Sequence, residues 1–309
     1  MKHSNKKILV IGKNGQLGQD LVAKLRVIRE PIALGRSECD LGNSEQVRAV
    51  VRSCRPDVII NAAAYTAVDR AESEPELAHL INAAGPQILA EEARRLGALL
   101  LQYSTDYVFD GTQSGPYSEL DSVCPINVYG RTKAEGEAAI TASGCRHLIF
   151  RTSWVFSDHG TNFLLTMLKL AKDRDELRIV SDQVGAPTLT ESIAQASIEA
   201  LTVLEKSPTP DALYGIYHMT ASGETSWFGF AGEIFRLAAE ASSARVPKLR
   251  PISTIEYPTP ARRPLNSRMS CNKLRLNFGV SLPSWQAGVQ VAMSSLLGRE
   301  DDRAMPVGI

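Results

Sequence analysis

A tyrosine and a lysine that together could move a proton stand four positions apart, at Tyr129 and Lys133. Residues at this spacing share one face of a helix. An ammonium group beside a phenol lowers the pKa of the phenol, which can then protonate the alkoxide formed at a reduced carbonyl. The same spacing also fits two side chains on a solvated helix, so the interpretation needs support from other residues.

A threonine at the end of a buried strand gives this support. Residues 99–101 are apolar, and the polar residues Ser104, Thr105 and Asp106 follow them. Ligands of open α/β sheets bind beyond the carboxyl ends of the strands, where Thr105 is expected to lie. Its hydroxyl could donate to the carbonyl oxygen that Tyr129 protonates. The alternative role for Thr105 is a cap at the strand end.

A glycine-rich turn near the N-terminus predicts a dinucleotide site. Gly12, Gly15 and Gly18 follow the apolar residues 7–11 and precede a helical pattern over residues 16–29. Glycines in such a turn let backbone N–H groups approach a pyrophosphate at the N-terminus of a helix. Three spaced glycines alone would also fit a purely structural turn, but their place between strand and helix favours the dinucleotide.

The end of the second predicted strand bears on the choice of cofactor. An acid there would bind the ribose hydroxyls of NAD, but the strand over residues 31–34 is followed by Gly35 and Arg36. An arginine can instead pair with a 2′-phosphate, which favours NADPH, with NADH as the alternative. Arg36 would otherwise be a solvated surface charge. Asp40 and Leu41, at the next turn, could receive the adenine.

The elements that position these residues alternate between short apolar strands and amphipathic helices. Strands are expected over residues 7–11, 31–34, 57–61, 98–101 and 147–150, and helices over 16–29, 44–54, 75–96 and 129–141. This alternation predicts an α/β protein with a Rossmann-type, doubly wound parallel sheet. We expect an NAD(P)-binding domain over residues 1–155. Residues 156–309 are expected to form mainly a smaller substrate-binding lobe, with some segments returning to the first domain.

The composition excludes several classes of protein. The chain has 309 residues, with 34 basic and 34 acidic side chains, so nothing indicates a nucleic-acid partner. Its five cysteines are scattered without metal-ligand spacing, so neither a zinc site nor a disulfide framework is expected. The sequence has neither an apolar signal core nor a membrane-spanning stretch, which favours a cytoplasmic protein.

Several strings, in this order along the chain, resemble the extended short-chain dehydrogenase/reductase superfamily. Within it, the chain looks most similar to the dTDP-4-dehydrorhamnose reductase family. The strings that carry this resemblance are Gly15-Gln16-Leu17-Gly18, Asn61-Ala62-Ala63-Ala64-Tyr65-Thr66-Ala67-Val68-Asp69, Ser104-Thr105-Asp106-Tyr107-Val108-Phe109-Asp110-Gly111, Arg151-Thr152-Ser153-Trp154-Val155-Phe156, Asp182-Gln183-Val184-Gly185-Ala186-Pro187-Thr188 and Ala261-Arg262-Arg263-Pro264.

The resemblance implies NAD(P)H-dependent reduction of the C4 ketone of dTDP-4-dehydro-6-deoxy-L-mannose to dTDP-L-rhamnose. Thr105, Tyr129 and Lys133 would be the catalytic residues, with hydride from the nicotinamide and the proton from Tyr129. Besides Gly12, Gly18 and Arg36, the cofactor would contact Gly15, Gln16, Leu17, Asp40, Leu41, Ala63, Ala64, Tyr65, Tyr103, Tyr129 and Lys133. The sugar nucleotide would contact Thr105, Asp106, Trp154 and Arg262.

Two of the implied substrate contacts have plain physical reasons. An indole face can pack against a deoxysugar ring, although a tryptophan after a strand is equally typical of a core. Arg262 and Arg263 could neutralise the pyrophosphate of the sugar nucleotide, the alternative being solvated charges. Some relatives dimerise through magnesium and clustered glutamates. Only Asp20 suggests such a cluster here, so no metal site is assigned, and Mg²⁺ dependence and a homodimer stay open.

Three other functions compete with reduction. A dehydratase on this scaffold would need two carboxylates directly after the threonine, but Asp106 is followed by Tyr107. An epimerase is a second alternative. It must release and recapture its keto intermediate, which the sequence does not exclude. A non-catalytic binding subunit is expected to lose part of the Thr105, Tyr129 and Lys133 set, and all three residues are present.

Overall fold

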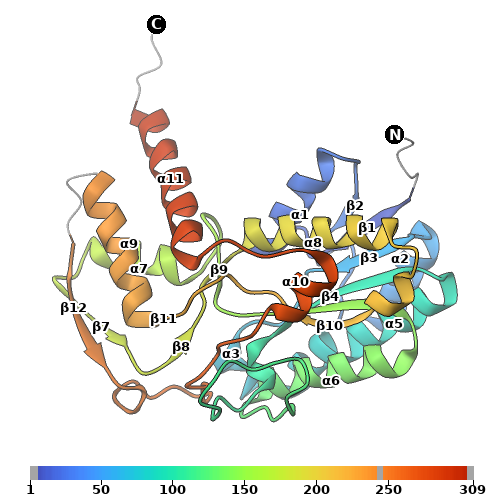
Figure 1. Cartoon of the computed structure of the whole chain (residues 1–309), viewed down its shortest axis with the longest axis horizontal. Helices are drawn as coiled ribbons and strands as arrows, with labels where there is room; N and C mark the ends of the chain where they lie inside the picture. The colour runs from blue at the N-terminus through green and yellow to red at the C-terminus, as the bar shows by residue number, and fades with distance from the viewer. Residues whose placement is uncertain (1–5, 242–245, 305–309) are drawn as a thin grey trace, which may run out of the picture.

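A six-stranded parallel sheet forms the centre of the molecule (Figure 1). The computed structural model describes residues 6–241 and 246–304, and the remaining residues of both predicted domains lie outside this range. The strand order is β10-β5-β4-β3-β1-β2. The strands are β1 (Ile8–Ile11), β2 (Ile32–Leu34), β3 (Val58–Asn61), β4 (Leu99–Thr105), β5 (Arg146–Thr152) and β10 (Gly215–His218). This order confirms the doubly wound α/β fold.

The strands are apolar on both sides because helices cover both faces of the sheet. Val10, Ile60 and Leu101 belong to one core cluster, whereas their neighbours Leu9 and Ile59 belong to another. The first face is covered by α1 (Gln16–Arg26), α8 (Thr190–Lys206) and α10 (Asn272–Phe278). The second is covered by α2 (Ser44–Cys54), α5 (Gly85–Leu96) and α6 (Val128–Ser143).

Two of the predicted helices differ from the observed ones. The helix expected over residues 16–29 ends at Arg26, because Val27 to Arg29 turn back toward Leu25 through backbone hydrogen bonds. The helix expected over residues 75–96 is present but changes its winding. It runs through α4 (Pro75–His79), a π-helical turn η1 (Leu80–Ala84) and α5. Such turns are rare and frequently mark functional sites.

Much of the chain after residue 155 packs around a separate apolar core, seen at the left of Figure 1. Short strand pairs join β6 (Val155–Phe156) to β9 (Thr188–Leu189), β7 (Glu176–Val180) to β12 (Lys248–Ile252), and β8 (Val184–Gly185) to β11 (Thr225–Ser226). The helices α7 (Phe163–Ala171), α9 (Trp227–Ala241) and α11 (Trp285–Ala304) pack with them. We call this part the second lobe. Among the described helices, none is long and apolar enough to cross a membrane.

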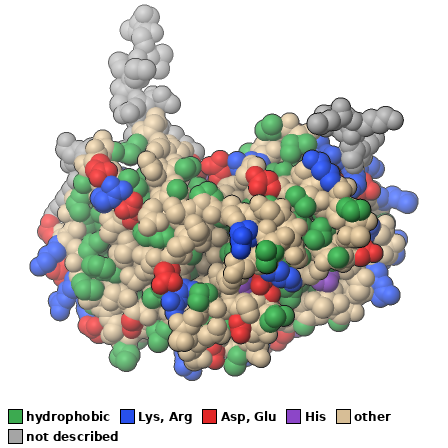
Figure 2. Space-filling view, viewed as in Figure 1, with side chains coloured by type: hydrophobic (Ala, Val, Ile, Leu, Met, Phe, Trp, Pro, Cys, Tyr) green, Lys and Arg blue, Asp and Glu red, His purple; other side chains and the backbone are tan. Residues whose placement is uncertain are grey.

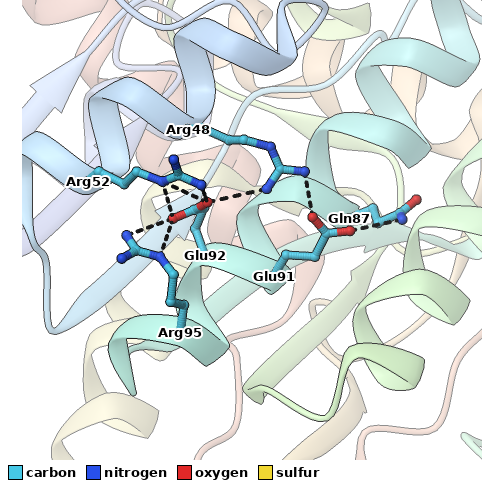
Figure 3. A network of polar contacts seen from close by, with 6 residues as sticks. All are labelled: Arg48, Arg52, Gln87, Glu91, Glu92 and Arg95. Carbon is cyan, nitrogen blue, oxygen red and sulfur yellow. Dashed lines mark hydrogen bonds and ion pairs between the residues drawn. The ribbon is translucent and has the colours of Figure 1, made fainter.

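A buried carboxylate ties α2 to α5 (Figure 3). Only 2% of the Glu92 side chain is exposed, and its oxygens accept from Arg52 at 2.6 Å, Arg95 at 2.9 Å and Arg48 at 3.3 Å. Arg48 also pairs with Glu91 at 2.6 Å. These arginines lower the pKa of Glu92 to about 2, the contact with Arg52 having the largest effect. The ion-pair cluster therefore holds α2 and α5 together on one face of the sheet.

Positive and negative side chains are interspersed over the face of the molecule shown in Figure 2. Neither sign forms a broad patch there. This distribution agrees with the zero net charge of the chain. Long-range attraction of a polyanion would need clustered basic residues, which this face does not offer.

Candidate functional site

The predicted catalytic residues meet where α6 begins, next to the carboxyl end of β4. Asn127 caps α6, its side chain accepting from the Gly130 N–H at 2.7 Å. A side chain at Gly130 would collide with the carbonyl oxygen of Tyr107, so only glycine lets the helix lie this close. The rings of Tyr107 and Tyr129 consequently meet edge to face, with centroids 5.7 Å apart. The structure thus brings Tyr129 to the residues that follow Thr105.

Thr105 is the last residue of β4, and its side chain is buried. Its hydroxyl donates to Oδ1 of Asp106 at 2.9 Å and accepts from the backbone N–H of Tyr107 at 3.1 Å. Burial raises the pKa of Asp106 to about 6, against the lowering effect of hydrogen bonds from Ser267 and Thr105. Thr105 therefore both caps the strand, as the alternative interpretation expected, and presents a hydroxyl next to Tyr129.

The protonation of Tyr129 differs from the sequence prediction. Burial raises the pKa of its phenol, the charge of Asp106 adds to this effect, and a hydrogen bond with Thr105 opposes it. Lys133 does not lower this pKa, because its ammonium donates instead to the Tyr103 carbonyl at 2.6 Å. Burial lowers the pKa of Lys133 itself to about 8. The expected lowering of the phenol pKa by the ammonium was therefore wrong for this structure, and the phenol keeps its proton at neutral pH.

Two buried polar residues that sequence analysis missed hold α6 in place. Asn82, in the π-helical turn η1, accepts from the Tyr65 backbone N–H at 2.9 Å and donates to the Thr132 hydroxyl at 3.2 Å. Glu137, one turn after Lys133, accepts three hydrogen bonds from Arg151 at 2.9, 3.2 and 2.6 Å. Asn82 lies in an apolar helix pattern that gave no signal. Glu137 stands four residues after Lys133, a spacing that could have been noticed.

The glycine turn has the geometry of a phosphate cradle. Gly12 has a φ of +93°, which strongly favours glycine, and its N–H donates to the Leu34 carbonyl at 2.8 Å. A side chain at Gly18 would collide with the Gly12 carbonyl oxygen. Gly15 is the N-cap of α1, so Gln16, Leu17 and Gly18 form its first turn, whose N–H groups have no partner within the helix. This turn fits a dinucleotide pyrophosphate.

The side chain of Gln16 is engaged elsewhere. Its Oε1 accepts from Asn162 at 2.7 Å and from Ser157 at 3.1 Å, and its Nε2 donates to the Thr161 carbonyl at 3.3 Å. Asn162 also caps α7. These contacts join the glycine turn to the second lobe, so a contact of Gln16 with a cofactor would come from its backbone.

The end of β2 carries charges of both signs. Arg36 is exposed, and its Nε lies 3.4 Å from Oδ2 of Asp40. The sequence analysis missed a second pair, in which Lys13 lies 2.6 Å from Glu38 while Glu38 accepts from the Gly35 N–H at 2.7 Å. Both cations of this turn, Arg36 and Lys13, are thus paired with acids of the same turn, and Arg36 is the one that the sequence predicts to meet a 2′-phosphate.

The remaining predicted cofactor residues surround the same sheet edge. Leu41 is buried against Gly85 at the start of α5. After β3, the Ala63 N–H donates to the Asn61 side chain at 3.2 Å, and Ala64 follows it with a partly buried side chain. Tyr65 bonds through its hydroxyl to Glu74 at 2.5 Å. Tyr103 is different, because its hydroxyl lies 2.7 Å from Ser197 on α8, so only its backbone faces Lys133.

The predicted substrate residues come from three different segments. Trp154 follows β5, and its ring stacks on Trp227 of α9 with centroids 3.7 Å apart. The side chain of Arg262 is exposed, while its carbonyl accepts from Asn127 at 2.7 Å. Arg263 departs from the prediction, because it pairs with Asp69 at 2.8 Å and is not free for a pyrophosphate. Of the two arginines, Arg262 is therefore the one that the structure leaves exposed for such a contact.

A cavity of about 420 Å³ lies between the middle of α1, the beginning of α8 and the middle of α11. Asp20, Glu191, Asp158, His159 and Ser295 contribute to its lining. Burial raises the pKa of Asp20, and a hydrogen bond with Thr190 opposes this. In residues 6–241 and 246–304, no group of three His, Cys, Asp or Glu residues is arranged to hold a metal ion. Within these ranges, the structure therefore adds no metal-binding partners to Asp20.

A family model and several close relatives identify the family of this chain. The model of the family described as "RmlD substrate binding domain" matches residues 6–297. A dTDP-4-dehydrorhamnose reductase of Burkholderia thailandensis is 46% identical over 297 residues, covering 95% of this chain and 100% of the relative. The reductase of Escherichia coli K12 is also 46% identical, covering 94% and 97%. A crystal structure of the Bacillus anthracis reductase in complex with NADP superposes with a TM-score of 0.87 at 36% identity, covering 94% and 100%.

Proposed function

This chain belongs to the dTDP-4-dehydrorhamnose reductase family, and we propose that it reduces the C4 ketone of dTDP-4-dehydro-6-deoxy-L-mannose to dTDP-L-rhamnose. The observation that supports this reaction best is the contact of α6 with residues 105–107. It places the Tyr129 phenol and the Thr105 hydroxyl beside one another at the carboxyl edge of the sheet. A ketone needs a proton donor and a hydrogen-bond donor at its oxygen.

The protein's own groups then have separate roles. Bound NADPH supplies the hydride that reaches C4. Thr105 turns its hydroxyl proton from Asp106 to the C4 oxygen, and Tyr129 gives its phenolic proton to that oxygen as negative charge develops. The raised pKa of the phenol suits this direction, because Tyr129 holds its proton until an alkoxide takes it. The ammonium of Lys133 donates a hydrogen bond to the Tyr103 carbonyl at 2.6 Å, which ties α6 to β4 and holds Tyr129 beside Thr105.

The cofactor residues are proposed from the fit of the glycine turn. A Cβ at Gly12 would lie 2.7 Å from the Ala63 nitrogen, and one at Gly18 would meet Gly12, so both glycines allow the tight turn that a dinucleotide site needs. Gln16 and Leu17 bind the pyrophosphate through N–H groups of the first turn of α1, and the N-cap Gly15, which has no side chain, lets it approach them. Arg36 selects the 2′-phosphate of NADPH, with NADH as the weaker cofactor.

The sugar nucleotide is proposed to lie between the sheet edge and the second lobe. Asp106 and Trp154 contact the sugar, and Arg262 binds the pyrophosphate. In this division of labour, residues 1–155 hold the cofactor and residues 156–309 mainly hold the substrate. The NADP of the Bacillus anthracis structure supports the choice of cofactor, and the names of the reductase relatives support the choice of substrate.

Turnover of the proposed substrate tests this function. The purified protein is mixed with NADPH and dTDP-4-dehydro-6-deoxy-L-mannose, and the nicotinamide absorbance and the sugar-nucleotide products are followed. Consumption of NADPH with formation of dTDP-L-rhamnose is expected. An altered sugar nucleotide formed without net loss of NADPH would indicate an epimerase instead, and the absence of any turnover would reject the assignment.

A dehydratase fits the site less well. Elimination of water needs a second carboxylate beside Asp106, and the next position is occupied by Tyr107. The phenol ring of Tyr107 is partly buried and meets the ring of Tyr129 edge to face. The site therefore lacks the second carboxylate that a dehydratase needs at this position.

A further inference from the structure

Trp154 has a backbone conformation that tryptophan rarely adopts. Its φ is +47°, in the left-handed region, which costs a side chain of this size on the order of 1–2 kcal/mol. Such strain persists only where the surrounding structure holds it, and it is concentrated at functional sites. Trp154 stands two residues after Thr152, which pairs in register with Thr105. The strained residue is therefore close to the end of the strand that carries the reacting groups.

The ring of Trp154 is held from one side by Trp227. The two indoles are nearly parallel, at 9°, with centroids 3.7 Å apart, so one face of Trp154 is covered. Trp227 is itself fixed, because its Nε1 donates to Gln183 at 3.0 Å and Phe163 packs on it at 4.8 Å. Gln183 is buried and donates in turn to Thr254 at 3.1 Å.

A glycine clears the space that the ring occupies. A Cβ at Gly185 would lie 2.7 Å from Cε2 and 3.0 Å from Nε1 of Trp154. The carbonyl of Trp154 accepts from the Thr188 N–H at 3.1 Å, which fixes the backbone on the same side. Trp227, Gly185 and Thr188 thus define one orientation of the indole, and all three belong to the second lobe.

We propose that Trp227 is a positioning residue for the sugar, acting through Trp154. Its ring covers one face of Trp154 and sets the orientation in which the other face receives the deoxysugar. This role rests on the proposed function, because it takes Trp154 as the substrate contact. The second lobe thereby affects how the sugar binds. The indole that meets the sugar follows strand β5 of the central sheet, but Trp227 on α9 sets its orientation.

Three variants separate this role from general packing. Trp227→Leu removes the stacked ring, and Gly185→Ala pushes Trp154 aside while Trp227 stays intact. Phe163→Leu is the matched control, because it loosens the same aromatic cluster on Trp227 without a contact to Trp154. A fourth variant, Trp227→Phe, retains an aromatic face and serves as the conservative replacement. For each, KM for the sugar nucleotide, KM for NADPH, kcat and Tm are measured, together with the circular-dichroism exciton couplet of the two indoles.

Trp227→Leu and Gly185→Ala are expected to raise KM for the sugar nucleotide about tenfold, in proportion to one lost aromatic contact, with kcat and KM for NADPH within about threefold of wild type. Gly185→Ala should also weaken the exciton couplet, whereas Phe163→Leu should keep both the couplet and the KM. Trp227→Phe should stay near wild type in KM.

An unchanged KM in Trp227→Leu would overturn the proposal, as would an equal rise in Phe163→Leu. These outcomes require a wild-type protein that turns over the keto sugar. A wild-type protein that does not do so contradicts the proposed function itself, and the positioning role then falls with it.

Discussion

At the scale of single residues, the site keeps the Tyr129 phenol protonated and brings the pKa of Lys133 closer to neutral pH. Burial raises the pKa of Tyr129 and lowers that of Lys133 to about 8. The sequence indicated both residues and Thr105 from type and spacing. It could not indicate the direction of the phenol pKa, because that depends on burial and on Asp106. Asn82, Glu137 and Trp227 were missed for a related reason, since their roles arise from contacts between distant segments.

The lowered pKa of Lys133 predicts a pH dependence. The ammonium is present below about pH 8 and is lost as the pH rises through that value, so kcat/KM for the keto sugar should fall on the alkaline side. Lys133→Arg keeps a charge that does not titrate. Its activity should be lower than that of wild type but should lack this alkaline fall. The same fall at the same pH in Lys133→Arg would show that another group titrates.

At the scale of elements, the close approach of α6 to β4 decides the geometry. The sequence predicted this helix and the strands around it well, because alternating apolar runs and helical spacing are local signals. It did not predict the π-helical turn η1, whose winding depends on the contacts of Asn82. Helix α9 was not predicted, although Phe230, Ile234 and Ala238 have helical spacing.

A methyl group at the α6 contact should separate the reacting groups. Gly130→Ala introduces a Cβ that collides with the Tyr107 carbonyl, so α6 must shift away from residues 105–107. A displacement of about 1 Å lowers kcat on the order of 100-fold. Gly232→Ala is the matched control, because this helical glycine has open space around its Cβ. It should keep full activity and gain up to about 1 kcal/mol in stability. Wild-type kcat in Gly130→Ala would contradict the account.

At the scale of the whole molecule, polar contacts join parts that are far apart in the sequence. Gln16 bonds to Asn162, Asn127 donates to the Arg262 carbonyl, and Asp69 pairs with Arg263, so the second lobe is tied to both ends of the predicted site. The sequence predicted a cofactor-binding domain followed by a substrate-binding lobe. It could not assign Arg263 to Asp69, because 194 positions separate these residues.

The buried Glu92 cluster should set the acid stability of the fold. Its pKa of about 2 lies below the usual 4.5, so its contribution is complete above about pH 4.5 and is lost as the pH falls toward 2. Glu92→Gln should lower the free energy of unfolding by about 2 kcal/mol at pH 7, with a difference that shrinks on acidification. Denaturant unfolding at several pH values measures this.

Glu91→Gln is the control for that measurement, because Glu91 is exposed and pairs with Arg48 at the surface. Its effect should stay below about 1 kcal/mol at every pH. Equal losses of unfolding free energy in the two variants would show that the burial of Glu92 does not determine its contribution to stability. Activity should be unchanged in both, since the hydrogen bonds and ion pairs of Glu91 and Glu92 go to residues of α2 and α5 and not to Tyr129.

Transfer of a labelled hydride tests the proposed reaction most directly. With NADPH that carries deuterium at both positions of the nicotinamide C4, dTDP-4-dehydro-6-deoxy-L-mannose should give dTDP-L-rhamnose with one deuterium at the sugar C4. Tyr129→Phe should still bind the cofactor through the glycine turn but form this product at least about 100-fold more slowly. Unlabelled product, or a Tyr129→Phe variant as fast as wild type, would contradict the account of C4 reduction with Tyr129 as the proton donor.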